Sequence, residues 1–221
     1  MDKMRTIRVA GKGQIRVRPD RTRITLTAEG IYRDCSETLR KSTENTELLK
    51  DLLTKFDFER SDLKTLNFSV DTEYESYKEK DTYRQRFVGY KFRHVMKVEF
   101  DFDNRRLGRI LYALAHCPAK PEFRLSYTVK DQESTKNELL GKAVMDAREK
   151  ASVLTKAAGV SLKDIQSIDY SWGEIDFEIR PMNHMDCLAA PKAIEGGGYD
   201  LDIEPDDIEV SDTVTVVWEI E

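Results

Sequence analysis

The sequence predicts an α+β protein with mixed, mainly antiparallel sheets and long helices packed on one face. Several runs alternate apolar and polar residues with a period of two, which is the pattern of half-buried strands. Other segments place apolar residues three or four positions apart, as amphipathic helices do. Strands and helices interleave but hairpins also occur, which favours α+β over a parallel sheet. The recurring order of strand, helix and strand suggests two related halves.

Residues 5–33 are predicted to form an antiparallel hairpin. The alternation over 5–17 resumes at 24–29 after a Pro-Asp turn. Gly11 and Gly13 interrupt the first run, which predicts a bulge or a sharp bend at that point.

A helix and a long hairpin are predicted next. Asp34 can cap the helix with Glu37 as its capping-box partner, and apolar residues share one face as far as Phe56. Residues 66–70 alternate as a third strand. The polar, tyrosine-rich segment 71–86 predicts a long hairpin with an exposed far end, from which the chain returns as a strand.

Two more helices follow. Asn104 is predicted to cap the first, and a strand is expected at 123–129. Asp131 opens the longest helix, which runs to about Ala158 and ends at a C′ glycine, Gly159. Several residues of its predicted buried stripe are alanines, so the helix can approach its support closely. The stripe contains Leu139, Leu140, Ala143, Ala147, Ala151 and Leu154.

The C-terminal part changes in character. A strand is expected at about 165–172. Prolines, a glycine triplet and acidic residues predict a mobile acidic loop at about 181–207, and a last strand is expected at about 208–220. We interpret residues 1–221 as a single domain.

Charge is distributed unevenly along the chain. The formal net charge of −5 divides into +7 for residues 1–120 and −12 for residues 121–221. The basic N-terminal end can be a nucleic-acid-binding arm. The two ends can equally attract each other, within one chain or between neighbours, and the acidic net charge favours this second interpretation.

Composition favours a globular, non-membrane protein. The charged fraction is 35%, but apolar residues recur along nearly the whole chain. No apolar stretch resembles a signal peptide or a transmembrane span, so a cytoplasmic location is expected.

Cysteines and histidines give no convincing metal or redox site. Cys35, Cys117 and Cys187 are widely spaced, so free thiols are expected. His184 and Cys187 supply at most half of a tetrahedral zinc site, and His116 adjoins Cys117. Cys35 precedes a predicted helix, where a thiol could sense oxidation, although a small buried thiol is the commoner outcome. We predict no metal and no cofactor.

The hairpin carries the most distinctive predicted surface, in which aromatic and basic residues are interleaved. Such a mixture suits a protein interface or a nucleic-acid surface. The neighbouring acidic residues would repel phosphates, which favours the protein interface; an exposed hairpin without a partner stays an alternative. The candidate interface residues are Tyr74, Tyr77, Tyr83, Arg84, Arg86 and Phe87.

Four motifs in order along nearly the whole chain carry a family resemblance. They are Val9-x-Gly11-x-Gly13-x5-Pro19-Asp20, Gly89-Tyr90, Ala143-x2-Asp146-Ala147-Arg148-x-Lys150-Ala151, and the alternating segment Ile208 to Ile220. Together they resemble the SIMPL-domain family, which includes a bacterial periplasmic group and an immunogenic outer-membrane-associated group. The secreted members differ from this sequence in having a signal peptide.

The resemblance implies an α+β fold with long helices packed on sheets. It further implies ring-like oligomers in some members and a link to oxidative stress in others, with no catalytic mechanism or cofactor to transfer. We therefore expect a non-enzymatic, self-assembling or partner-binding protein, and the resemblance adds an association with stress to this expectation. One alternative is a nucleic-acid binder that uses the basic N-terminal strands. The other is an enzyme with an unrecognised site built from scattered residues.

Overall fold

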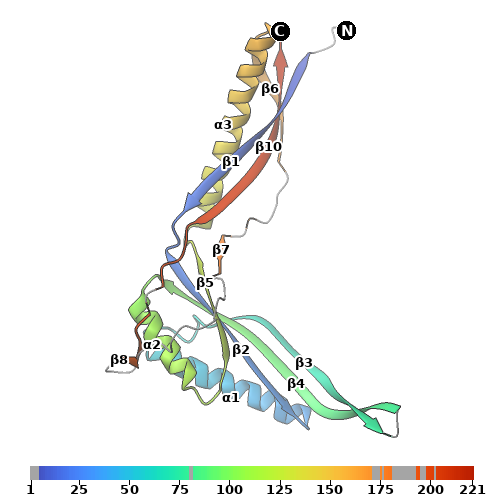
Figure 1. The fold of residues 1–221 in the computed structure, drawn as a ribbon, viewed down its shortest axis with the longest axis vertical. Helices are drawn as coiled ribbons and strands as arrows, with labels where there is room; N and C mark the ends of the chain where they lie inside the picture. The colour runs from blue at the N-terminus through green and yellow to red at the C-terminus, as the bar shows by residue number, and fades with distance from the viewer. Residues whose placement is uncertain are drawn as a thin grey trace. The chain divides into compact units, whose positions relative to one another are not determined.

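The structure is a computed structural model that describes residues 5–79, 82–170, 175, 177–180, 193–194, 198–201 and 203–221. Three helices and antiparallel sheets occur in this described part, which confirms the predicted α+β class. The chain divides into two compact units (Figure 1). The first contains residues 1–20, 128–179 and 206–221, and the second contains residues 21–127 and 180–205. The single domain over 1–221 stays a prediction.

The first unit contains a three-stranded sheet with one long helix packed on it. The strand order is β1-β10-β6 and both pairings are antiparallel. The helix α3 packs mainly on β1 and β10. The elements are β1 (Thr6–Val17), α3 (Gln132–Ala158), β6 (Leu162–Asp169) and β10 (Ile208–Ile220), and a short strand, β7 (Glu178–Ile179), belongs to the same unit.

The glycines of β1 lie against the backbone of α3. A Cβ built on Gly11 would come within 2.1 Å of the carbonyl oxygen of Ala143, and one on Gly13 within 2.2 Å of that of Leu139. The register of β1 against β10 is unbroken through both glycines. The predicted bulge or bend is therefore wrong. Glycine at these positions leaves room for the backbone of the helix and does not interrupt the strand.

The ends and the buried stripe of α3 follow largely from its sequence. The Asp131 side chain accepts a hydrogen bond from the Ser134 amide at the N-cap, and Gly159 adopts a left-handed conformation at the other end, with φ of 69°. The buried residues repeat every four positions. Two predicted members of the stripe therefore differ: Leu140 is only partly buried, and Leu154, which is 51% exposed, is replaced by Thr155. The buried residues are Leu139, Ala143, Ala147, Ala151 and Thr155.

The predicted N-terminal hairpin does not form. β1 pairs with β10, whereas the next strand, β2 (Arg21–Tyr32), pairs with β4 (Thr82–Asp101) of the second unit. Both segments are strands, as their alternation predicts. Alternation identifies the buried face of a strand but not its partner, and here each partner is distant in sequence.

Opposite charges at the two ends of the chain meet within one chain. Arg16 of β1 forms an ion pair with Glu209 of β10. Arg8 forms another with Asp169 of β6, with 2.9 Å between Nη2 and Oδ2. This agrees with the intramolecular version of the predicted attraction between the ends.

The second unit contains a sheet, helices α1 and α2, and a two-stranded pair. Within this unit the strands of the main sheet follow the order β3-β4-β2-β5, and β8 pairs with β9. The remaining bounds are α1 (Cys35–Thr54), β3 (Lys64–Glu79), α2 (Asn104–Ala115), β5 (Glu122–Thr128), β8 (Ala193–Ile194) and β9 (Gly198–Tyr199). β8 and β9 lie in the predicted loop 181–207, most of which is outside the described residues.

Caps and a buried core fix the helices on this sheet. The Asp34 side chain caps α1 as predicted, accepting hydrogen bonds from the amides of Ser36 and Glu37. α2 is capped by Asp103, one residue before the predicted Asn104. Fully buried apolar side chains from both helices and from β2 and β4 form the core; they include Ile24, Leu26, Leu49, Leu53, Phe92, Met96, Val98, Leu107 and Ile110.

Candidate functional site

A two-stranded ribbon extends from the sheet of the second unit. β2 pairs with β4 only as far as Tyr32, opposite Tyr90, whereas β3 and β4 continue to pair up to Glu79 and Thr82. Residues 73–79 and 82–89 therefore form a ribbon with no third strand among the described residues, and Figure 1 shows the two strands continuing together beyond β2.

All six predicted interface residues lie on this ribbon, and all are exposed. The exposed fractions are 52% for Tyr74, 39% for Tyr77, 76% for Tyr83 and 45% for Phe87. Single exposed apolar residues are normal, but four aromatic side chains on one projecting ribbon are typical of an interaction surface.

The ribbon brings some of these side chains together and keeps others apart. Tyr74 and Phe87 are cross-strand partners whose rings meet edge to face, with centroids 5.7 Å apart. Phe87 also contacts Tyr90, at 5.5 Å. Tyr77 and Tyr83 make no ring contact with any described residue. Tyr90 is not among the residues predicted from the sequence. A bulge in β4 at Val88 places it beside Phe87, and no sequence signal marks that bulge.

Charge separates the two strands of the ribbon. β3 carries Asp71, Glu73 and Glu75, whereas residues 82–98 of β4 contain basic residues and no carboxylate. Glu75 accepts a hydrogen bond from Arg86 across the strands, with 2.7 Å between Oε2 and Nη2. β3 also carries one cation in the ribbon, Lys78, so the β3 edge has a net negative charge and the β4 edge a net positive charge.

A hollow of about 500 Å³ lies beside the base of the ribbon. Its lining residues are Arg33, Glu75, Arg86, Phe87 and Val88. An aromatic ring flanked by charged groups can receive a side chain from another protein. The hollow thus shares Arg86 and Phe87 with the predicted interface.

The other predicted chemical candidates are separate from the ribbon or outside the described residues. Cys35 is exposed at the start of α1 and Cys117 is buried. The His116 ring approaches the carbonyl oxygen of Tyr112 through Nδ1, at 2.8 Å. His184 and Cys187 lie outside the described residues. The described part of the chain contains no group of three metal-ligating side chains.

None of the helices among the described residues is both long and apolar enough to cross a membrane.

The fold and this surface define an α+β protein with a helix packed closely on glycines and an exposed β-ribbon. The SIMPL family profile, described as "Protein of unknown function (DUF541)", matches residues 7–218. The chain belongs to the SIMPL family, and the resemblance seen in the sequence is confirmed. A comparison with curated proteins found no match.

Proposed function

We propose that this protein is a non-enzymatic, self-assembling protein that uses its ribbon to dock on a second copy. The observation that supports the proposal most strongly is the pairing of β3 with β4 beyond the end of β2, which exposes four aromatic side chains. An isolated two-stranded ribbon is marginally stable in water. Packing against another chain would stabilise it.

The free edges of the ribbon favour docking by strand addition. An unpaired edge presents a row of backbone N–H and C=O groups that another strand can bind. Along residues 73–79 and 82–89, neither edge of the ribbon has a neighbouring strand among the described residues. Tyr, Phe and Arg side chains on the same ribbon are those that protein interfaces favour.

The charge pattern favours a second copy as the partner. The acidic β3 edge of one ribbon complements the basic β4 edge of another. The same acidic edge would repel the phosphates of a nucleic acid. Arg8 and Arg16 of the basic N-terminal strand are already in ion pairs, which further favours assembly over nucleic-acid binding.

Light scattering on a sizing column tests the proposal. We expect a discrete oligomer for the unmodified chain. The double variant Tyr77→Ser/Tyr83→Ser should shift it toward monomer without loss of ring packing inside the chain. A matched control, Met145→Ser/Val153→Ser, removes comparable exposed apolar groups from α3, where the two side chains are 64% and 68% exposed, and should leave the mass unchanged. A monomeric unmodified chain at all concentrations would contradict the proposal.

A further inference from the structure

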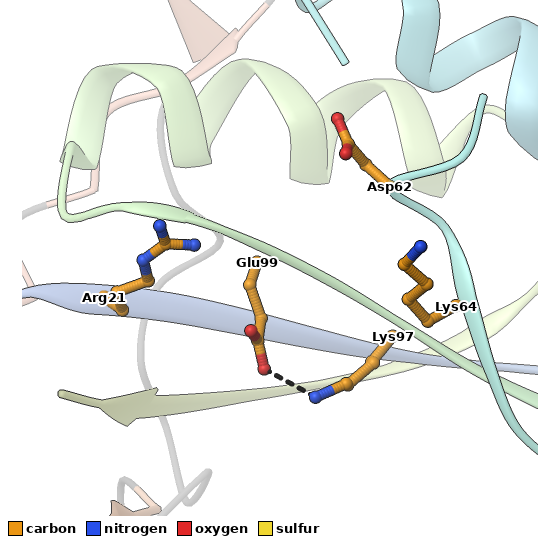
Figure 2. A pocket seen from close by; sticks show the side chains of 5 residues that line it. All are labelled: Arg21, Asp62, Lys64, Lys97 and Glu99. Atoms are coloured by element: carbon orange, nitrogen blue, oxygen red, sulfur yellow. Dashed lines mark hydrogen bonds and ion pairs between the residues drawn. The ribbon is translucent and has the colours of Figure 1, made fainter. Parts of the chain in front are cut away.

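A second hollow, of about 150 Å³, lies where β2, β3 and β4 run side by side. Its lining residues are Arg21, Asp62, Lys64, Lys97 and Glu99. Figure 2 shows Arg21 at one end, Lys64 at the other, and Glu99 and Lys97 between them. Three cationic side chains from three strands therefore converge on one small space.

The carboxylates of the hollow are already engaged. Glu99 Oε1 accepts hydrogen bonds from Lys97 Nζ at 2.9 Å and from Arg23 Nε at 2.7 Å. Asp62 Oδ2 accepts one from the backbone amide of Glu59, at 2.9 Å. Neither carboxylate is within ion-pairing distance of Lys64 or Arg21.

The cations are less well satisfied. Lys64 is the cross-strand partner of Lys97, and like charges in that position destabilise a sheet. Lys64 forms no ion pair with the described residues. Arg21 forms a long ion pair with Asp101, with 3.6 Å between Nε and Oδ1, but its buried Nε has no hydrogen-bond acceptor.

We infer that this hollow binds a small phosphate-type oxyanion. Such an anion would relieve the repulsion between Lys64 and Lys97 and would supply acceptors to Arg21, whose planar guanidinium suits oxyanions. The hollow, of about 150 Å³, has room for one phosphate group with some of its water. Asp62 and Glu99 limit the net positive charge, so a single phosphate group fits better than a polyanionic strand.

The binding test is a titration of backbone amide chemical shifts in the full chain. Inorganic phosphate is added at constant ionic strength, maintained with sodium chloride, so that general screening stays fixed. We expect saturable shifts at residues 62–64 and 97–101. A parallel titration with phosphoserine distinguishes free phosphate from a phosphomonoester, because the form that the site prefers saturates at lower concentration.

Variants separate a built site from general attraction. Lys64→Gln and Arg21→Gln should each raise the apparent Kd for phosphate about tenfold, which is the effect of losing one charge-assisted hydrogen bond. Asp62→Asn, which keeps an oxygen for the Glu59 amide, should tighten binding. The control Lys91→Gln changes a lysine that is paired with Glu29, at 3.0 Å, and should have no effect. Shifts that do not saturate, or that Lys64→Gln and Lys91→Gln reduce equally, would overturn the inference.

Discussion

Gly11 of β1 and Ala147 of α3 are in direct contact. A Cβ built on Gly11 would lie 2.5 Å from the backbone nitrogen and 2.6 Å from the Cβ of Ala147. Adjacent to this contact, the amide of Lys12 donates a 2.7 Å hydrogen bond to Asp146 Oδ2. The helix therefore packs on the face of β1 and also satisfies one backbone group of this strand.

The variant Gly11→Ala tests the close contact. The added methyl would clash with backbone atoms that cannot move independently, so we expect a loss of about 3 kcal/mol in the free energy of unfolding, the upper end of ordinary overpacking. Urea unfolding measures it. Gly141→Ala is the matched control, because Gly141 lies in α3 with open space around it and should gain up to about 1 kcal/mol. A Gly11→Ala protein as stable as the unmodified chain would refute the contact.

Asp146→Asn should lower the urea midpoint at neutral pH. Hydrogen bonds from Lys150 and from the Lys12 amide hold the pKa of Asp146 below its usual 3.8. The stabilisation is therefore complete above that value and is lost as the pH falls through the lower folded-state pKa. The difference between Asp146→Asn and the unmodified chain should shrink in acid. Glu149→Gln, on the same helix, should change little at any pH; equal effects of the two variants would contradict this role.

His94 is held as one neutral tautomer between α1 and β3. The Thr46 hydroxyl donates to the Ser42 carbonyl oxygen at 2.9 Å, so it accepts a hydrogen bond from Nδ1 of His94, at 3.1 Å. Nε2 then accepts from the Thr65 hydroxyl, at 2.9 Å. Protonating Nε2 would require that hydroxyl to turn around and give up its hydrogen bond to the ring.

This arrangement predicts a loss of stability in mild acid. Burial, and secondarily the charge of Lys50, lower the pKa of His94 below 6.5. The unfolded chain therefore binds the proton first. Stability is full above about pH 6.5 and falls as the pH drops toward the folded-state pKa. Urea midpoints across this range should show the decline, and His94→Gln should remove that component. Parallel profiles for the two proteins would contradict the prediction.

Local chemistry explains what the sequence predicted correctly. Asp34, Asp131 and Gly159 act at helix ends through contacts within a few residues, so their roles can be read from the chain. The exposed hairpin was predictable for the same reason, because residues 71–86 form one continuous polar, tyrosine-rich segment between apolar strands.

Long-range packing explains the errors. The sequence around Gly11 and Gly13 fits a bulge and a close helix contact equally well. Only the position of α3 in the fold distinguishes the two. The partner of β1 is β10, at the other end of the chain, whereas alternation does not identify a partner and proximity in sequence favoured the adjacent strand. The sequence did not predict the second hollow, because its cationic residues Arg21, Lys64 and Lys97 form no local motif.

Two charge-reversal variants, studied separately and as a mixture, test the central claim that ribbons of separate copies bind each other. Glu73→Lys/Glu75→Lys makes both edges of the ribbon basic, and Arg84→Glu/Arg86→Glu makes both acidic. Each variant alone should be monomeric by light scattering, because its edges repel those of its own copies. An equimolar mixture should assemble, since each basic edge then meets an acidic one. Assembly of either variant alone, or a mixture that stays monomeric while the unmodified chain assembles, would contradict the account.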